Sequence, residues 1–159
     1  MKTSKLMVLL LSTIALTGCV RGSGKSKKSY KEVSYEEFHE KAVKAFDKVS
    51  EAGYTLVTVK GFIKTSDTDI DVDTKFDVKD GVPAPRTEEI VVFSIASMNA
   101  AAVPGDEETV YYVGSSGFKV TLDEEEVFGE AIFDKYGLMT SYKTEYVDQK
   151  MELTLKWSK

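Results

Sequence analysis

The stretch TDIDVDTKFDV, residues 68–78, places an apolar residue or a threonine at every even position and a charged residue at every odd one. A period of two is the period of a β-strand, in which successive side chains point to opposite faces of the sheet. One face of this strand is suited to a core and the other to water, which is typical of an antiparallel sheet with one solvated side. The stretch therefore predicts a strand of such a sheet.

Working outward, residues 54–64 predict a strand before it, with a turn near Ser66 and Asp67. After it, Asp80-Gly81 predicts a turn, and Pro83 and Pro85 an extended connection. Residues 88–95 are mostly apolar and predict a further, central strand. Residues 97–103 are small and leave strand end, short helix and loop all open.

The remaining sequence predicts more antiparallel structure and a second helix. Two short strands are expected at 109–113 and 118–122, joined by a glycine- and serine-rich turn at 114–117. Residues 123–136 have an acidic first turn followed by Val127, Ala131 and Ile132, which predicts a short helix. A closing hairpin is expected from 138–147 and 150–157, with Glu145 opposite Glu152 in the simplest register.

A longer helix is predicted to begin at Ser34. Ser34 and Glu37 have the spacing of a capping box, in which each side chain satisfies a backbone N–H of the first turn. An apolar stripe follows at three- and four-residue spacing and requires a partner surface. Gly53 is expected to end the helix. The stripe comprises Tyr35, Phe38, Ala42, Ala45, Phe46 and Val49.

Together these elements predict one α+β domain over residues 34–159. We expect a curved antiparallel sheet of about seven strands, with the N-terminal amphipathic helix and a shorter second helix packed on one face. This order of elements resembles the half-barrel fold of LolA and of the LppX/LprG-type lipoproteins. The resemblance implies that the concave face binds acyl chains or other apolar ligands. From the apolar stripe of the helix and the alternation of the last strand, we expect Tyr35, Phe38, Phe46 and Trp157 to line such a site. If the sheet is flat, the same residues form an ordinary core.

The first nineteen residues predict export and lipid anchoring. A basic start is followed by an apolar segment at 6–16, which is too short to span a bilayer but suits a secretion signal. Leu16-Thr17-Gly18-Cys19 resembles the lipobox of bacterial lipoproteins. That resemblance implies a signal peptide over 1–18, cleavage between Gly18 and Cys19, and acylation of Cys19. Cys19 is the only cysteine in the chain, so an internal disulfide is impossible.

Charge is divided unevenly along the chain. Residues 19–33 are expected to be a flexible tether; five of its residues are basic and only Glu32 is acidic. Residues 33–159 carry 14 basic and 25 acidic side chains. The acidic body makes nucleic acid an unsuitable partner, because phosphate binding requires the opposite sign. The basic tether either serves only as a polar linker or also contacts anionic lipid headgroups.

Catalytic and metal-binding patterns are missing from the sequence. His39 is the only histidine, so neither a catalytic triad nor a usual zinc ligand set can be assembled around it. Asp67, Asp69, Asp71 and Asp73 resemble the start of a calcium loop, but Val72 and Val78 stand where that loop needs glycine and glutamate. We therefore expect no cofactor and no metal, and read the aspartates as a charged strand face.

These observations lead to two hypotheses of different class. The first is a non-catalytic lipoprotein of the cell membrane, on the extracellular or periplasmic side, which binds a lipid or a similar apolar molecule between sheet and helix. The second is a protein-interaction or envelope-structural module with an acidic surface and a solid core. A hydrolase using two of the many carboxylates is a distant third. Whether the space between helix and sheet is empty or filled separates the first two.

Overall fold

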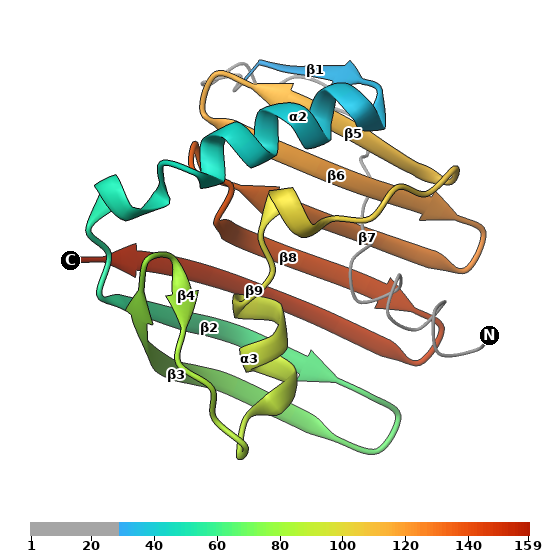
Figure 1. The fold of residues 1–159 in the computed structure, drawn as a ribbon. Coiled ribbons are helices and arrows are strands. Elements are labelled where there is room, and N and C mark those ends of the chain that lie inside the picture. The colour runs from blue at the N-terminus through green and yellow to red at the C-terminus, as the bar shows by residue number, and fades with distance from the viewer. Residues whose placement is uncertain (1–28) are drawn as a thin grey trace.

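The computed structural model describes residues 29–159, so the predicted signal peptide, Cys19 and residues 20–28 lie outside it. A single open antiparallel sheet of nine strands dominates the fold, with the order β1-β5-β6-β7-β8-β9-β2-β3-β4 (Figure 1). The strands are β1 (Tyr30–Val33), β2 (Leu56–Lys64), β3 (Asp69–Lys79), β4 (Val82–Pro83), β5 (Thr109–Gly114), β6 (Gly117–Glu124), β7 (Val127–Phe133), β8 (Met139–Tyr146) and β9 (Gln149–Ser158).

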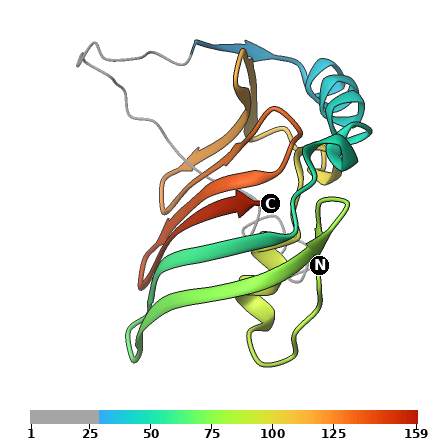
Figure 2. The same ribbon diagram turned by 90° about the vertical axis from the view of Figure 1, so that its left-hand side faces the viewer.

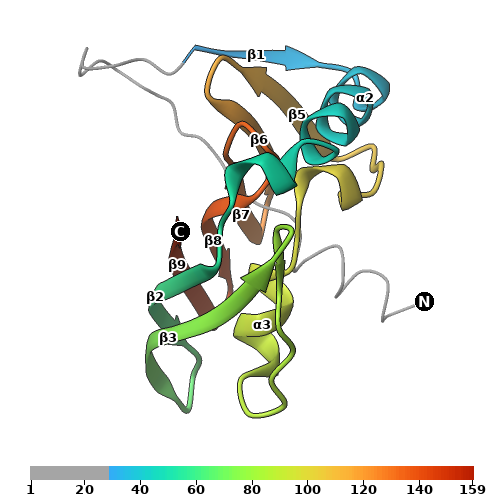
Figure 3. The same cartoon turned by 60° about the vertical axis from the view of Figure 1, so that its left-hand side comes forward.

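All the helical segments lie on one side of this sheet, and the sheet curls toward them (Figures 2 and 3). They are the α-helices α2 (Tyr35–Phe46) and α3 (Ile90–Ala96) and the short 3₁₀ segments η1 (Val49–Ala52) and η2 (Ala100–Ala102). We call this side the helix face and the opposite side the outer face. The prediction of an α+β fold is confirmed at this level, although the sheet has nine strands rather than about seven.

A row of cross-strand neighbours shows how the helix face forms the core. The row crosses the sheet from β5 to β9, and every member is buried. Because alternate residues of each strand share this face, the polar residues between them point to the outer face. The row consists of Tyr111, Val120, Ala131, Tyr142 and Leu153.

The outer face carries the charges of the alternating strands. In the β2–β3 hairpin, Lys60 is opposite Asp73 and Lys64 is opposite Asp69, with N–O distances of 3.9 and 3.6 Å. The side chains of residues 68–78 therefore alternate between the two faces as predicted: Val72 and Phe76 are buried on the helix face, and the aspartates are exposed to water. Exposed pairs of this kind add at most about 1 kcal/mol each, so burial on the helix face stabilises the hairpin more.

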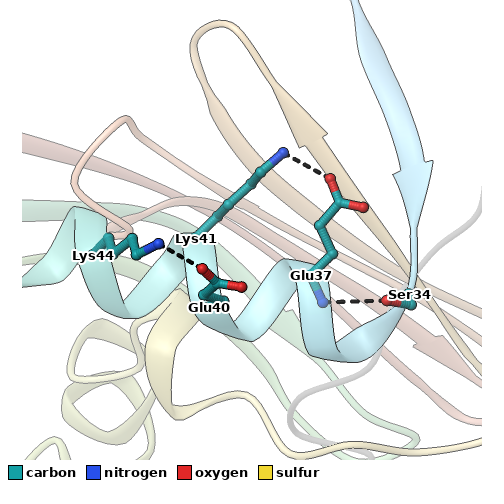
Figure 4. Close-up of polar contacts among 5 residues, drawn as sticks. All are labelled: Ser34, Glu37, Glu40, Lys41 and Lys44. Carbon is teal, nitrogen blue, oxygen red and sulfur yellow. Dashed lines mark hydrogen bonds and ion pairs between the residues drawn. The ribbon is translucent and has the colours of Figure 1, made fainter.

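Helix α2 begins as the sequence predicts. The Ser34 hydroxyl accepts a 3.2 Å hydrogen bond from the backbone N–H of Glu37 (Figure 4). On the solvent side, Lys41 pairs with Glu37 at 2.7 Å and Lys44 with Glu40 at 2.5 Å, each one turn apart. The helix ends at Phe46, however, and Gly53 ends the following 3₁₀ segment η1 with a φ of 65°.

Two predicted elements have the wrong type. Residues 123–136, expected to be a helix, form the end of β6, a turn and β7. Residues 88–95, expected to be a central strand, instead contain the start of α3 and lie against the sheet rather than in it. The first error arose because Val127 and Ala131 are four apart, a spacing that shares a face in a helix and in a strand alike. The second arose because a short apolar run has no decisive period.

Two smaller expectations also need correction. Tyr30–Val33, assigned to the tether, forms β1 and pairs with β5, so ordered structure begins before Ser34. In the closing hairpin, Glu145 lies opposite Lys150 and Glu152 opposite Lys143, with a Lys143–Glu152 distance of 3.8 Å. The predicted register placed two glutamates opposite each other, whereas the observed register forms two pairs of opposite charge. Pairs of opposite charge are favourable between neighbouring strands.

Candidate functional site

The aromatic residues predicted to line a ligand site under α2 are parts of a packed core. Phe38 is fully buried, with its ring centroid 5.1 Å from Tyr111 and 5.6 Å from Phe118. Tyr35 lies 5.2 Å from the same Tyr111 ring. Rings at such distances and tilted angles are in contact, so they fill the space between α2, β5 and β6.

The segment between α3 and β5 completes this packing by crossing the helix face. Tyr35 donates a hydrogen bond to the Val103 carbonyl (3.1 Å), and Tyr111 donates one to the Pro104 carbonyl (2.8 Å). Earlier in the same segment, the N–H of Ala100 donates a 2.8 Å hydrogen bond to the carbonyl of Gly137. These bonds hold η2 and the following residues against α2 and the sheet.

The other two predicted lining residues are not brought into that cluster. Trp157 lies on β9, where its indole N–H donates a 2.8 Å hydrogen bond to the Met139 carbonyl and its ring neighbours Tyr54 at 6.2 Å. Phe46 is partly buried at the last turn of α2. Tyr35 and Phe38 thus share the Tyr111 ring, while Trp157 packs on the same hydrophobic core from β9 and neighbours Tyr54.

An open groove lies instead beside α3, at the end of the sheet opposite α2. It has a volume of about 410 Å³ and runs between the β2–β3 hairpin and the first turn of α3. Three of its apolar side chains face solvent to a degree unusual for aliphatic residues: Ile90 is 62%, Ile70 48% and Val91 46% exposed. Ile63, Val72 and Val92 form its floor.

Helix α3 is attached to the sheet by one hydrogen bond and by the packing of its buried side chains. The Thr74 hydroxyl, on the helix face of β3, donates a 2.5 Å hydrogen bond to the carboxylate of Glu89, the residue before the helix. Val92 and Ile95 are buried, and the Phe93 ring packs edge-on against Phe76 at 6.0 Å. The buried half of α3 therefore anchors it, which leaves Ile90 and Val91 outward.

The groove has an acidic surround. Between residues 67 and 89 the chain carries eight carboxylates and three basic side chains. Asp71, Asp73, Glu88 and Glu89 lie along the groove, the two aspartates with their side chains on the outer face of the edge strand β3. Its apolar centre and negative rim together suit an occupant that is apolar in part and positively charged in part.

The outer face holds a second polar arrangement around Lys119. The Lys119 ammonium lies over the rings of Tyr30 and Tyr112, at 4.9 and 4.5 Å from their centroids. Burial raises the pKa of the neighbouring Glu130 carboxyl, against the opposing effects of Lys119 and Lys143. This arrangement fastens the short strand β1 to the sheet.

The residues considered for catalysis or metal binding lie on the surface. His39 is exposed on α2 and stacks on Tyr35 at 5.6 Å. Asp69 and Asp73 face lysines of β2 rather than one another. Within residues 29–159, no group of three or more histidine, cysteine, aspartate or glutamate side chains is arranged to hold a metal ion.

The groove was missed by sequence reasoning because residues 88–95 were expected to be a strand. Ile90, Val91, Val92 and Phe93 form four consecutive apolar residues, a run that suits a fully buried strand and a helix alike, so no signal in the sequence separated the two. On a short helix lying on a sheet, two of the four necessarily face away from it.

Comparison of the chain with protein-family models, with curated proteins and with solved structures finds no match. Among the described residues, no helix has the length and apolar character needed to cross a membrane. The case for function therefore depends on the sequence and on the geometry of the groove.

Proposed function

We propose that this protein is a non-catalytic, lipid-anchored domain on the exported side of a bacterial membrane, and that it binds a partner protein in the groove between α3 and β3. The observation that carries the proposal is the contrast between two places. The space under α2 is filled by Phe38, Tyr111 and Phe118, whereas Ile70, Ile90 and Val91 remain exposed around an open groove.

Exposed aliphatic side chains that are grouped and rimmed by polar residues are typical of protein interaction sites. The groove joins such a group to an acidic rim, and it is built on a hydrogen-bonded helix and strand. A site that is already formed in the free protein needs less ordering of side chains on binding.

An apolar small molecule in the same groove is the second candidate. The volume of about 410 Å³ falls within the range of small-ligand pockets, and its floor is aliphatic. This candidate keeps the lipid-binding function implied by the LolA resemblance but moves the ligand from the space under α2 to α3.

Anchoring rests on Cys19 and the preceding Leu16-Thr17-Gly18. Two acyl chains would hold the domain stably at a membrane, which one chain does not. We expect Cys19→Ala to leave the chain uncleaved or soluble, as judged by detergent partitioning and intact mass. A variant that still partitions with lipid at an acylated mass would refute the anchoring proposal.

Photo-crosslinking in the intact cell envelope tests the binding proposal. A photoreactive amino acid at Ile90 is expected to form a discrete adduct with a partner protein. Because this adduct depends on the groove, it is expected to be lost when the Ile70→Lys substitution is added. The matched control is the same photoreactive residue at Val147, which is 67% exposed on the β8–β9 turn. Adducts that consist of lipid alone would favour the second candidate, and equal protein adducts at both positions would refute a specific site.

A further inference from the structure

The edge of the sheet beside the groove is open for most of its length. Strand β3 pairs with β2 over nine residues, but on its other side β4 pairs only with Val78 and Lys79. Within residues 29–159, no strand adjoins Asp69–Phe76 on that side. Figure 1 shows β3 at the lower margin of the sheet, with α3 and the chain that leads into it in front of the strand.

The backbone groups available at this edge follow from the hydrogen bonds of β3. The N–H of Val78 donates to Thr55 of the chain leading into β2, whereas the Asp77 carbonyl faces the other way and accepts from Ala84. In an antiparallel strand this direction alternates residue by residue. Consequently the N–H and C=O groups of Asp71, Asp73 and Lys75 point outward, toward the open edge.

The side chains along the edge present two distinct rows. Ile70 and Val72 lie on the helix face and belong to the groove, together with Ile90 and Val91 of α3. Asp69, Asp71 and Asp73 lie on the outer face. On the β2 side this aspartate row already meets lysines, since Lys60 and Lys64 pair with Asp73 and Asp69.

We propose that the partner binds by strand addition: a segment with alternating basic and apolar residues pairs with the Asp69–Phe76 edge of β3. Its apolar residues enter the groove against Ile70 and Ile90, and its basic residues lie beside Asp71 and Asp73. Main-chain hydrogen bonds supply affinity in this mode and alternate side chains supply specificity. This inference rests on the proposed function and specifies the partner's chemistry.

The same charges argue against a second copy of this chain as the occupant. Two β3 edges paired with each other would bring aspartates of one strand opposite aspartates of the other, and like charges directly opposite destabilise a strand pair. A charged edge strand is a common protection against self-association. A basic strand turns the same charges into attraction, as β2 does on the opposite side.

A synthetic peptide of seven alternating lysines and valines, blocked at both ends, is the probe. The protein is expressed with its own N-terminus and purified in detergent. We expect the peptide to bind it and to protect the backbone amides of Asp71 and Asp73 from hydrogen exchange. Two control peptides are used: one of the same composition with lysines and valines in separate blocks, and one in which glutamate replaces lysine. Both are expected to bind at least about tenfold more weakly.

Three variants separate the elements of the site. Asp71→Pro removes an edge N–H that β2 does not use, Asp71→Lys reverses one rim charge, and Ile90→Ser removes an exposed groove side chain. Each is expected to weaken peptide binding about tenfold, with the fold intact by circular dichroism. Val147→Ser, on the β8–β9 turn, is the control for Ile90→Ser, because Val147 is 67% exposed and Ile90 62%, and it is expected to leave binding unchanged.

Equal binding of the alternating and block peptides would overturn strand addition, as would binding insensitive to Asp71→Pro. If a specific protein adduct at Ile90 persists in that case, the proposed function stands and only the binding mode is wrong. If the adduct is also absent, both proposals fail.

Discussion

The Thr74 hydroxyl and the Glu89 carboxylate form a 2.5 Å hydrogen bond, which ties the centre of β3 to the residue that precedes α3. Fifteen positions separate them in sequence, and the chain between them contains the Asp80-Gly81 turn and two prolines. This bond joins the start of α3 to β3 beside the groove.

Thr74→Val should loosen α3 without unfolding the sheet. Valine matches threonine in shape but lacks the hydroxyl, so the Glu89 carboxylate loses its partner at a cost of about 1–2 kcal/mol. We expect faster hydrogen exchange of the α3 amides, measured by mass spectrometry on peptides covering residues 90–96. Thr121→Val, at another buried threonine, is the control. Unchanged exchange in α3 would mean that Phe93 and Ile95 alone hold the helix.

Phe38→Ala should destabilise the fold rather than empty a binding site. The Phe38 ring is fully buried against Tyr111 and Phe118, and removing such a ring typically costs about 3–5 kcal/mol. Urea denaturation followed by circular dichroism measures the change. Val43→Ala, on the same helix but 37% exposed, should change stability by less than about 0.5 kcal/mol. A small effect of Phe38→Ala would indicate a loosely filled interior under α2.

Gly61→Ala should be among the most damaging single-methyl additions in this chain. Gly61 has a φ of 152°, and a Cβ there would lie 1.8 Å from the Glu152 carbonyl oxygen of the neighbouring strand. The β2–β9 pair would have to separate, at a cost we expect to exceed about 3 kcal/mol. Gly53→Ala is the matched control. Gly53 also has a positive φ, of 65°, but no atom lies near the position of an added Cβ, so we expect only about 1–2 kcal/mol of backbone strain. Similar melting temperatures for the two variants would contradict this contrast.

Glu130→Gln should stabilise the protein at neutral pH and lose that advantage in acid. Burial raises the pKa of the Glu130 carboxyl above its unfolded value, only partly offset by Lys119 and Lys143. A raised carboxyl pKa means that the folded state favours the protonated form, so its contribution to stability is present in acid and is lost as pH rises through the folded pKa. Denaturation curves at pH 7 and near pH 4 measure the difference between variant and parent. A larger advantage of glutamine at pH 4 would reverse the assigned sign.

Much of the sheet could be predicted from its sequence because the strands carry strong local patterns. Residues 68–78 alternate without interruption, and the last hairpin alternates at Met151, Leu153, Leu155 and Trp157. The start of α2 was predictable too, since Ser34 and Glu37 form a local capping interaction. The site was not predictable in this way. Of the four residues predicted to line it, Phe38 is part of a solid core, and Trp157 neighbours Tyr54 elsewhere on the sheet.

By itself, the sequence determined the strand faces and the charge of the outer surface, because each depends on residues close together in the chain. The targeting signal at residues 1–19 stays a prediction from the sequence. Tertiary structure decided the type of residues 88–95 and 123–136, the pairing of Glu145 with Lys150, and the position of β9 between β8 and β2. The physical reason is that short apolar runs satisfy helix and strand periods alike. Which one forms depends on the distant surface that buries them, and for Ile90–Ala96 that surface is the helix face of β2 and β3.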